Sequence, residues 1–113
     1  MNSRPARAGV YYGKKKAGVL SKTEAGYEFI YELAYLADPE AMPISLGMPL
    51  RPEKYESKAL FPFFAGLLPE GWLLDLISAA AKIDKNDEFG LLLHTGQDPI
   101  GAVSILPSEK SNE

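Results

Sequence analysis

The apolar residues of this chain change their spacing once, near Ser57, and this change limits the folds that the chain can adopt. Before Ser57, short segments alternate between apolar and polar residues, which is typical of strands with one buried face. After Ser57, apolar residues recur every three or four positions, which is typical of amphipathic helices. Strands followed by helices favour the α+β class, in which helices pack on one face of an antiparallel sheet.

The first part of the chain predicts four strands. Ala8–Tyr12 and Ala17–Leu20 flank a turn of one glycine and three lysines, which predicts a hairpin. Residues 27–31 follow a second turn, and their aromatic side chains share one face of a strand. Residues 43–50 alternate again, but their prolines cannot complete a ladder, so we expect an edge or bulged strand. Residues 33–37 are ambiguous and could form a single helical turn.

Three helices are predicted after Ser57. Residues 59–68 form a short apolar helix with Pro62 in its first turn, where a missing N–H is harmless. A second helix begins at Pro69. The third helix can be capped by Asn86 or Asp87 and runs to about residue 95.

The second helix carries one apolar stripe that we expect to face the core. At 100° per residue, its members fall on one side of the helix. They are Leu73, Leu76, Ile77, Ala80 and Ile83. Ser78 and Lys82 fall on the opposite side, where we expect solvent.

Gly96 is the stop signal of the third helix, and residues 101–106 form a last, β-branched strand. The order of elements therefore predicts a small antiparallel sheet of about five strands with three helices on one face. We expect a single domain over residues 1–113, with an ordered core over about 7–107 and flexible ends. Six aromatic residues are expected in the core by their strand or helix spacing: Tyr27, Phe29, Tyr31, Phe61, Phe63 and Phe64.

Composition excludes several classes of protein. A chain of 113 residues can bury one core but hardly two. It contains no apolar run near the roughly 20 residues of a membrane-spanning helix, and its first residues do not resemble a secretory signal. The absence of cysteine excludes disulfides and thiolate sites and fits a cytoplasmic protein. A net charge of −3 argues against a protein that coats nucleic acid.

The sequence also lacks the residue patterns that catalysis needs. His94 is the single histidine, whereas a metal site built on imidazoles needs two or three. Residues 96–101 have the glycine spacing of a phosphate-binding loop, but Ala102 and Val103 stand where the lysine and the hydroxyl residue should follow. We therefore expect no enzyme activity, no metal and no cofactor.

Four segments resemble a known family. Residues 63–71 (FFAGLLPEG) look like the FFxxLLPEG signature of the N-terminal domain of HipA-type toxin kinases. Residues 43–50 (PISLGMPL) are similar to the PLSLSLPL segment that precedes it in that family. Residues 89–92 and 96–103 resemble the family's FxLL and GxDxxGAV motifs. The resemblance runs from about Val10 to Leu106.

This resemblance implies the N-terminal subdomain of a HipA-type kinase, present as a separate protein. The nucleotide-binding and catalytic residues of such kinases lie in a body that has no counterpart here, so none can be assigned. In tripartite HipBST-type toxin–antitoxin systems, a small HipS-like protein restrains a shortened kinase, and a HipB-like helix-turn-helix repressor completes the complex. The resemblance therefore implies a bacterial antitoxin that binds a HipA-like kinase and reaches DNA at most indirectly, through the repressor.

A subunit that is not tethered to its kinase needs strong contact residues. Trp72 is the best candidate, because it lies roughly 75° from the centre of the stripe and because tryptophan is enriched at interface hot spots. Leu74, about 125° from the same centre, is likewise hard to bury. Pro69, Glu70 and Gly71 complete the predicted contact segment. The alternatives are that Trp72 packs on Pro69 within its own domain, and that Glu70 serves only the helix dipole.

Two other functions stay open. The chain could be a structural module that stabilises the kinase or its repressor complex without inhibiting it. It could also be a stand-alone domain that binds a small molecule or nucleic acid, which the net charge disfavours. Lys14, Lys15 and Lys16 form the basic cluster of the sequence; a solvated hairpin tip is the first interpretation and DNA contact the second.

Overall fold

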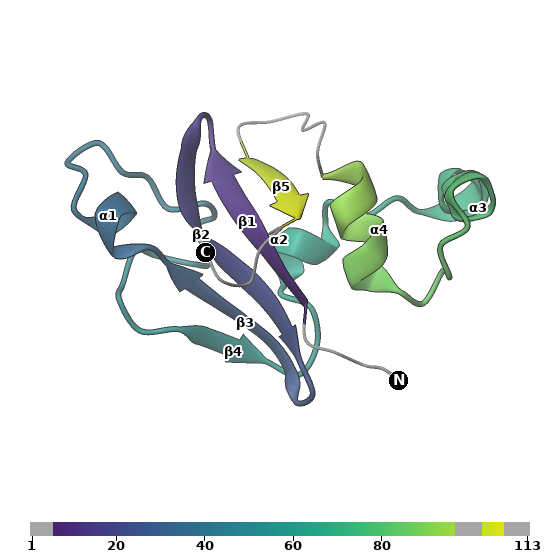
Figure 1. Cartoon of the computed structure of the whole chain (residues 1–113), viewed down its shortest axis with the longest axis horizontal. Coiled ribbons are helices and arrows are strands. Elements are labelled where there is room, and N and C mark those ends of the chain that lie inside the picture. The colour runs from purple at the N-terminus through teal and green to yellow at the C-terminus, as the bar shows by residue number, and fades with distance from the viewer. Residues whose placement is uncertain (1–5, 97–102, 108–113) are drawn as a thin grey trace.

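The computed structural model describes residues 6–96 and 103–107, which form a five-stranded antiparallel sheet and four helices. The order of the strands across the sheet is β4-β3-β2-β1-β5, so β4 and β5 are the edges (Figure 1). The strands are β1 (Ala6–Tyr12), β2 (Lys15–Thr23), β3 (Gly26–Tyr31), β4 (Tyr55–Ser57) and β5 (Val103–Pro107). The predicted α+β class and the predicted size of the sheet are confirmed.

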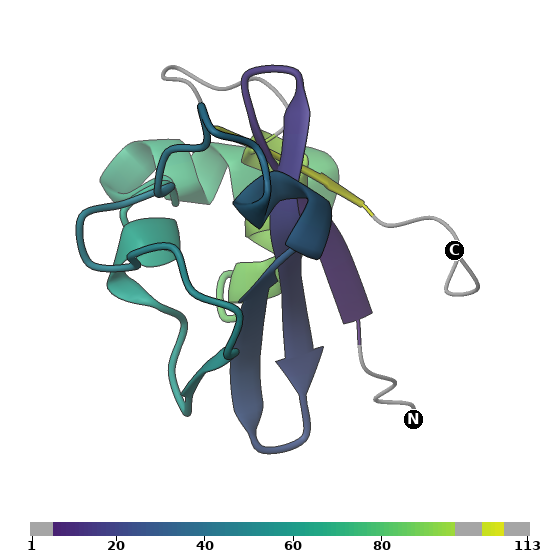
Figure 2. The same ribbon diagram turned by 90° about the vertical axis from the view of Figure 1, so that its left-hand side faces the viewer.

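The helices within the described residues are short. They are α1 (Leu33–Leu36), α2 (Pro62–Ala65), α3 (Gly71–Ala81) and α4 (Glu88–Thr95). The structure has one helix more than the three expected, because the ambiguous segment after β3 forms the single helical turn α1. Seen from the side in Figure 2, α1 lies in front, at the end of the sheet that is farthest from α3.

The core lies on one face of the sheet, under α2, α4 and the loop before β4. Paired positions such as Leu20 and Phe29, or Val10 and Ile105, point to the same face and are fully buried. The prediction of the aromatic core is confirmed: four of the six residues are buried, and Tyr27 and Phe63 are half-buried against them. The four are Phe29, Tyr31, Phe61 and Phe64.

The ring of Phe29 joins the sheet to α2. It lies across β2 at Gly18, where a Cβ atom would be only 2.7 Å from the ring carbon Cζ and 2.3 Å from the Ile30 carbonyl oxygen. The ring centroid of Phe29 is 4.9 Å from that of Tyr31 and 5.9 Å from that of Phe64. A glycine is therefore required at position 18 for the aromatic core to close.

Local signals placed both ends of α4 and the position of Pro62 in α2 correctly. Pro62 occupies the first turn of α2, although this helix is shorter than the predicted 59–68. Asp87 caps α4, since its Oδ1 accepts a hydrogen bond of 2.9 Å from the amide N–H of Gly90. Gly96 follows α4 as expected and is buried, with a virtual Cβ 2.8 Å from Ile105.

The expectation of a strand over residues 43–50 is wrong. Ile44 and Met48 are buried, but Leu46, which a strand would place on the same face, is fully exposed, and the backbone forms turns and pairs with no strand. Tyrosine hydroxyl groups, rather than a neighbouring strand, bind several of its backbone groups. The Tyr31 hydroxyl donates to the Met48 carbonyl and accepts from the Ile44 N–H, and the Tyr55 hydroxyl donates to the Pro49 carbonyl. The fourth strand is β4, further along the chain.

Some sequence expectations fall outside the described residues. These are the flexible ends, most of the glycine-containing segment 96–101, and the first part of the last strand. Within the described part, that strand is observed as β5, paired with β1.

We predict that Tyr31→Phe lowers the free energy of unfolding by about 1–3 kcal/mol, because it leaves two buried backbone groups without partners. Burial raises the pKa of Tyr31, which keeps its hydroxyl protonated and able to donate. Denaturant unfolding measures the change. Tyr11→Phe, at a half-buried position on the opposite face of the sheet, is the control and should change stability by less than about 0.5 kcal/mol. Equal losses in both variants would contradict the role given to Tyr31.

Candidate functional site

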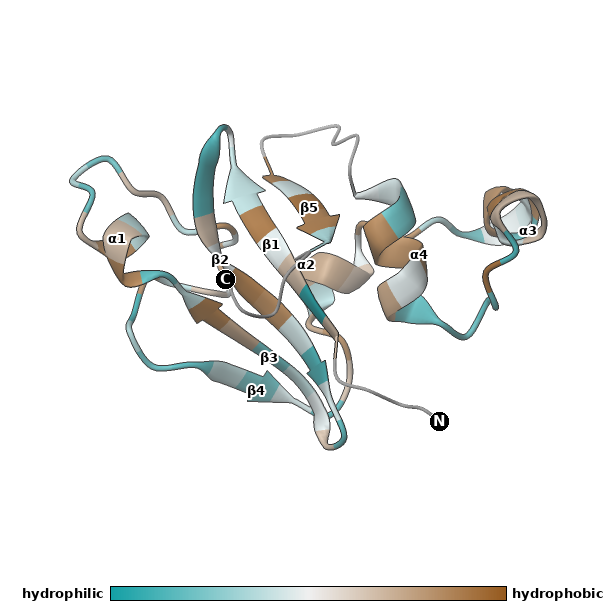
Figure 3. Cartoon of the chain, in the orientation of Figure 1, coloured by the Kyte–Doolittle hydropathy of each residue, from teal (hydrophilic) through white to brown (hydrophobic). Residues whose placement is uncertain are grey.

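Helix α3 stands apart from the core. None of its residues is buried, whereas α4, which is shorter, buries Phe89, Leu91 and Leu92. In Figure 1, α3 lies at the far end of the molecule, on the other side of α4 from the sheet. Figure 3 shows that this outlying helix is nevertheless largely hydrophobic. A helix with apolar residues on most of its surface is normally covered by protein on more than one side.

The exposed side of α3 is apolar. Trp72 is 75% exposed, Leu76 55% and Leu73 41%, and both Ala79 and Ala80 are exposed between them and the end of the helix. By helix geometry these five residues span an arc of about 120° with Leu76 at its centre. We call them the α3 face. Exposed apolar residues that gather on one helix mark an interaction surface, whereas scattered ones do not.

The orientation predicted for α3 is wrong. Leu73, Leu76 and Ala80, which belong to the stripe expected in the core, are exposed. Ser78 was expected in solvent but is half-buried, and its hydroxyl donates to the Ile83 carbonyl. Ile77 does lie on the inner side, with Leu74. Both sides of α3 are apolar, so its hydrophobic pattern alone could not decide which side the domain covers.

The predicted contact residues divide between the two sides. Trp72 is on the exposed side, and Glu70 and Gly71 are exposed beside it at the start of α3. Pro69 and Leu74 are half-buried, so Leu74 does not lie on the exposed flank where its angle placed it. Sequence reasoning missed Leu73 and Leu76 as exposed residues. One signal in the sequence could have identified them: apolar residues occur on nearly every side of this helix, so some of them must face away from the core.

A left-handed residue lies at each end of α3. Gly71 begins the helix with φ of 59°, and a Cβ atom there would meet nothing within 4 Å, so the backbone angle rather than space favours glycine. Lys82 follows the helix with φ of 59° and ψ of 45°. An ion pair between Asp75 and Lys85 connects the helix to the segment behind it. Both side chains of this ion pair are exposed to solvent, so it contributes little to the stability of the segment.

The lysine cluster lies at the other end of the molecule and is largely neutralised. The Lys15 Nζ lies 2.5 Å from Oδ2 of Asp38, and the Lys16 Nζ lies 3.3 Å from Oε2 of Glu32. The hydrogen bond with Asp38 raises the pKa of Lys15, and the same bond lowers the pKa of Asp38. Because two of the three lysines have acidic partners, the structure favours the solvated hairpin tip over DNA contact.

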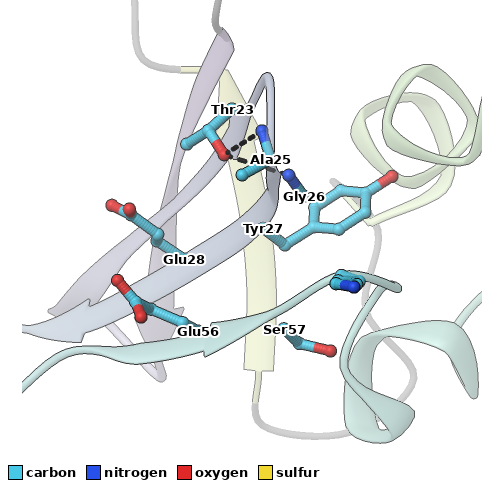
Figure 4. Close-up of a pocket in the computed structure, with 8 residues that line it drawn as sticks. Thr23, Ala25, Gly26, Tyr27, Glu28, Glu56 and Ser57 are labelled. Atoms are coloured by element: carbon cyan, nitrogen blue, oxygen red, sulfur yellow. Dashed lines mark hydrogen bonds between the residues drawn. The ribbon is translucent and has the colours of Figure 1, made fainter.

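An open pocket of about 380 Å³ lies between the β2–β3 turn and the end of β4. Figure 4 shows the Tyr27 ring on one side of it, while Glu28 and Glu56 point to the other side. The Thr23 hydroxyl accepts hydrogen bonds from the N–H groups of Ala25 and Gly26, so it shapes the turn. Glu28 and Glu56 share Lys54 as an ion-pair partner at 3.3 and 3.2 Å. The serine and threonine hydroxyl groups that line this pocket bind backbone amides, and its two carboxylates pair with a lysine. The pocket therefore shows no nucleophile hydrogen-bonded to a base.

The described part of the chain contains no group of three potential metal ligands. His94 is exposed near the end of α4. No helix among these residues has the length and hydrophobicity needed to cross a bilayer. The α3 face is therefore the strongest candidate for a functional surface.

Comparison with known proteins points to one family. Residues 8–106 match the family described as HipA N-terminal domain. A solved structure of the N-terminal domain of HipA toxin superposes with a TM-score of 0.71 and 30% identity, over 98% of this chain and 100% of that chain. An uncharacterized protein of Haemophilus influenzae is 38% identical over 88 residues, which are 78% of this chain and 79% of the relative.

Two further relatives are much longer than this chain. "Putative kinase Y4mE" of Sinorhizobium fredii is 34% identical over 82 residues, which are 73% of this chain and 20% of the relative. "Putative kinase Y4dM" of the same organism is 30% identical over 104 residues, which are 87% of this chain and 25% of the relative. The chain thus spans only a fifth to a quarter of these two proteins.

We predict that Trp72→Ala changes the free energy of unfolding by less than about 0.5 kcal/mol, because its side chain is mostly in solvent. Phe64→Ala, at a fully buried aromatic residue, is the matched comparison and should lower stability by about 3–5 kcal/mol. Thermal or denaturant unfolding of both variants measures the difference. A large loss in Trp72→Ala would place this tryptophan in the core and remove it from the α3 face.

Proposed function

Because the chain belongs to the HipA N-terminal domain family, we propose that it is an antitoxin subunit that binds a HipA-like serine/threonine kinase through the α3 face and neutralises it. The observation that carries the proposal is the exposure of Trp72, Leu73 and Leu76 on a helix without a buried residue. The role is non-enzymatic: the subunit acts by contact alone.

The longer relatives suggest what covers the α3 face. In the two kinase-named proteins, the matching segment is followed or preceded by three-quarters or more of the chain. A domain that is part of such a chain can place an apolar helix against the remaining body. When the same domain is a separate chain, the same helix has to find that body by diffusion. A HipA-like kinase body is therefore the partner that fits this surface.

Binding without a tether demands a strong anchor. A covalent connection supplies an effective concentration in the millimolar range, which a separate subunit lacks. Trp72 can compensate for this loss, since a tryptophan buried at the centre of an interface is commonly worth 2 kcal/mol or more. Its position at the start of α3, next to exposed Glu70 and Gly71, gives a partner access to it from several directions.

Two modes of neutralisation are compatible with this surface. If Trp72 enters the nucleotide cleft of the kinase, inhibition is steric, because ATP or the loop that covers it is displaced. If α3 binds elsewhere, the subunit inhibits by favouring an inactive conformation of the kinase. A HipB-like helix-turn-helix repressor would complete a ternary complex and make the contact with DNA. The pairing of Lys15 and Lys16 with acidic residues agrees with such an indirect role.

The second candidate is a structural module that stabilises the kinase or its repressor complex without inhibiting it. The same helix would bind the same body, so the binding surface does not distinguish the two functions. The length of the two kinase-named relatives favours this candidate, because in them the domain belongs to a much longer chain. Only the activity of the kinase in the complex separates the candidates.

We predict that Trp72→Ala weakens binding to the HipA-like kinase proposed as the partner by about 30-fold, which corresponds to about 2 kcal/mol. Titration calorimetry with the purified proteins measures it. Leu46→Ala is the matched control, because Leu46 is completely exposed but lies in the loop before β4, far from α3 along the chain. Its affinity should stay within twofold of the unchanged protein. Equal affinities for Trp72→Ala and the unchanged protein would place the kinase contact elsewhere.

We also predict that an equimolar amount of this protein suppresses phosphate transfer by that kinase, and that Trp72→Ala restores most of the activity. Radiolabelled autophosphorylation measures the effect, and growth of cells that produce both proteins gives a second readout. Inhibition is expected because the bound helix blocks or distorts the kinase. Full kinase activity in a stable complex would reject the antitoxin and support the structural module.

A further inference from the structure

The α3 face has its largest residues at one end and its smallest at the other. Trp72 and Leu73 lie in the first turn of α3, and Ala79 and Ala80 lie in the last. Leu76 is both the centre of the exposed arc and the midpoint of the helix, which runs from Gly71 to Ala81. A helix with this gradient of side-chain size is complementary to a second copy of itself that runs in the opposite direction.

We propose that, in the absence of a kinase, two copies of this chain pair through their α3 faces as an antiparallel, two-fold symmetric dimer. A two-fold axis at Leu76 brings together residues that are equally far from it on either side. Trp72 and Leu73 of one copy then face Ala79 and Ala80 of the other. Large side chains fill the space above small ones at both ends, and the two Leu76 side chains meet at the axis.

The charges at the ends of α3 favour the same direction. Glu70 precedes the helix by one residue and Lys82 follows it by one, and both are exposed. In the antiparallel pair, each Glu70 lies at the level of Lys82 of the second copy, whereas a parallel pair brings like charges together. The helix dipoles also oppose each other only in the antiparallel pair. Shape and charge therefore both favour a second copy in the antiparallel orientation over one in the parallel orientation.

The pairing is expected to be weak. An 11-residue helix is only about 16 Å long, so the contact falls in the size range of transient interfaces. The small residues at its ends let the helices approach to the usual interaxial distance of about 8–10 Å. A weak dimer covers Trp72 when the chain is alone and releases it when a tighter partner competes. This last, regulatory consequence rests on the proposed function, whereas the pairing itself does not.

Cysteine cross-linking tests the pairing directly, because the chain has no cysteine of its own. Leu76→Cys places two thiols at the two-fold axis, so mild oxidation should convert most of this variant into a disulfide-linked dimer. Ala80→Cys should give little dimer, since its two copies lie about 12 Å apart along the helix axes. Ala25→Cys, in the exposed β2–β3 turn, reports random collisions. Efficient dimers from both Leu76→Cys and Ala80→Cys would indicate a parallel pair and overturn the proposal.

Sedimentation of the protein without cysteine tests the same pair reversibly. The mass should rise from monomer to dimer with concentration, and Ala80→Trp, which fills the space for Trp72, should raise the midpoint concentration at least tenfold. Glu70→Lys or Lys82→Glu should also raise the midpoint several-fold, and the double reversal should return it to within twofold. A protein that stays monomeric up to about 1 mM, with Leu76→Cys no more dimeric than Ala25→Cys, would overturn the pairing. Kinase binding by the protein is measured separately, so that result would leave the proposed function intact.

Discussion

The burial of Phe29 and Tyr31 side by side on β3 is the interaction on which the rest of the fold depends. Phe29 crosses the sheet at Gly18 and meets Phe64, so it fixes where α2 lies. Tyr31 continues the aromatic contact, with its ring 6.1 Å from that of Tyr35, and its hydroxyl holds the loop before β4 by two backbone groups. Sheet, helix and loop therefore share one aromatic cluster, and the face of the sheet that carries it is complete without α3.

Because the core face of the sheet is covered by other segments, α3 keeps an exposed apolar side. The core face is covered by α2, by α4 through Phe89 and Leu92, and by the loop through Ile44 and Met48. The core face therefore leaves little room for α3, which follows α2 in the chain and turns only Leu74, Ile77, Ser78 and Ala81 partly inward. Its remaining apolar residues gain nothing within the domain and are free for another protein.

The features that were predictable from the sequence are those set by neighbouring residues. The hairpin, the proline in α2, the cap at Asp87 and the aromatic core all follow from local periodicity or from one side chain bonded to a nearby amide. The prediction of a strand over residues 43–50 failed because alternating apolar residues in a loop give the same sequence pattern as a strand. In the structure Leu46 is fully exposed, and the backbone is bonded to the hydroxyl of Tyr31, which lies 17 residues before Met48. The orientation of α3 failed because a helix with two apolar sides carries no signal of which side its own domain uses. Trp72 is exposed as its angle suggested, but its role in binding stays a prediction.

The left-handed residues at the two ends of α3 have an evolutionary consequence. Gly71 begins the helix and Lys82 follows it, both in the left-handed conformation, and no side chain between them is buried. We therefore expect substitutions at the exposed positions between them to change the rest of the domain little. The partner recognition proposed for this helix can therefore diverge while the scaffold stays constant. Related copies within one genome could acquire separate, non-cross-reacting partners by exchanging a single stretch of eleven residues.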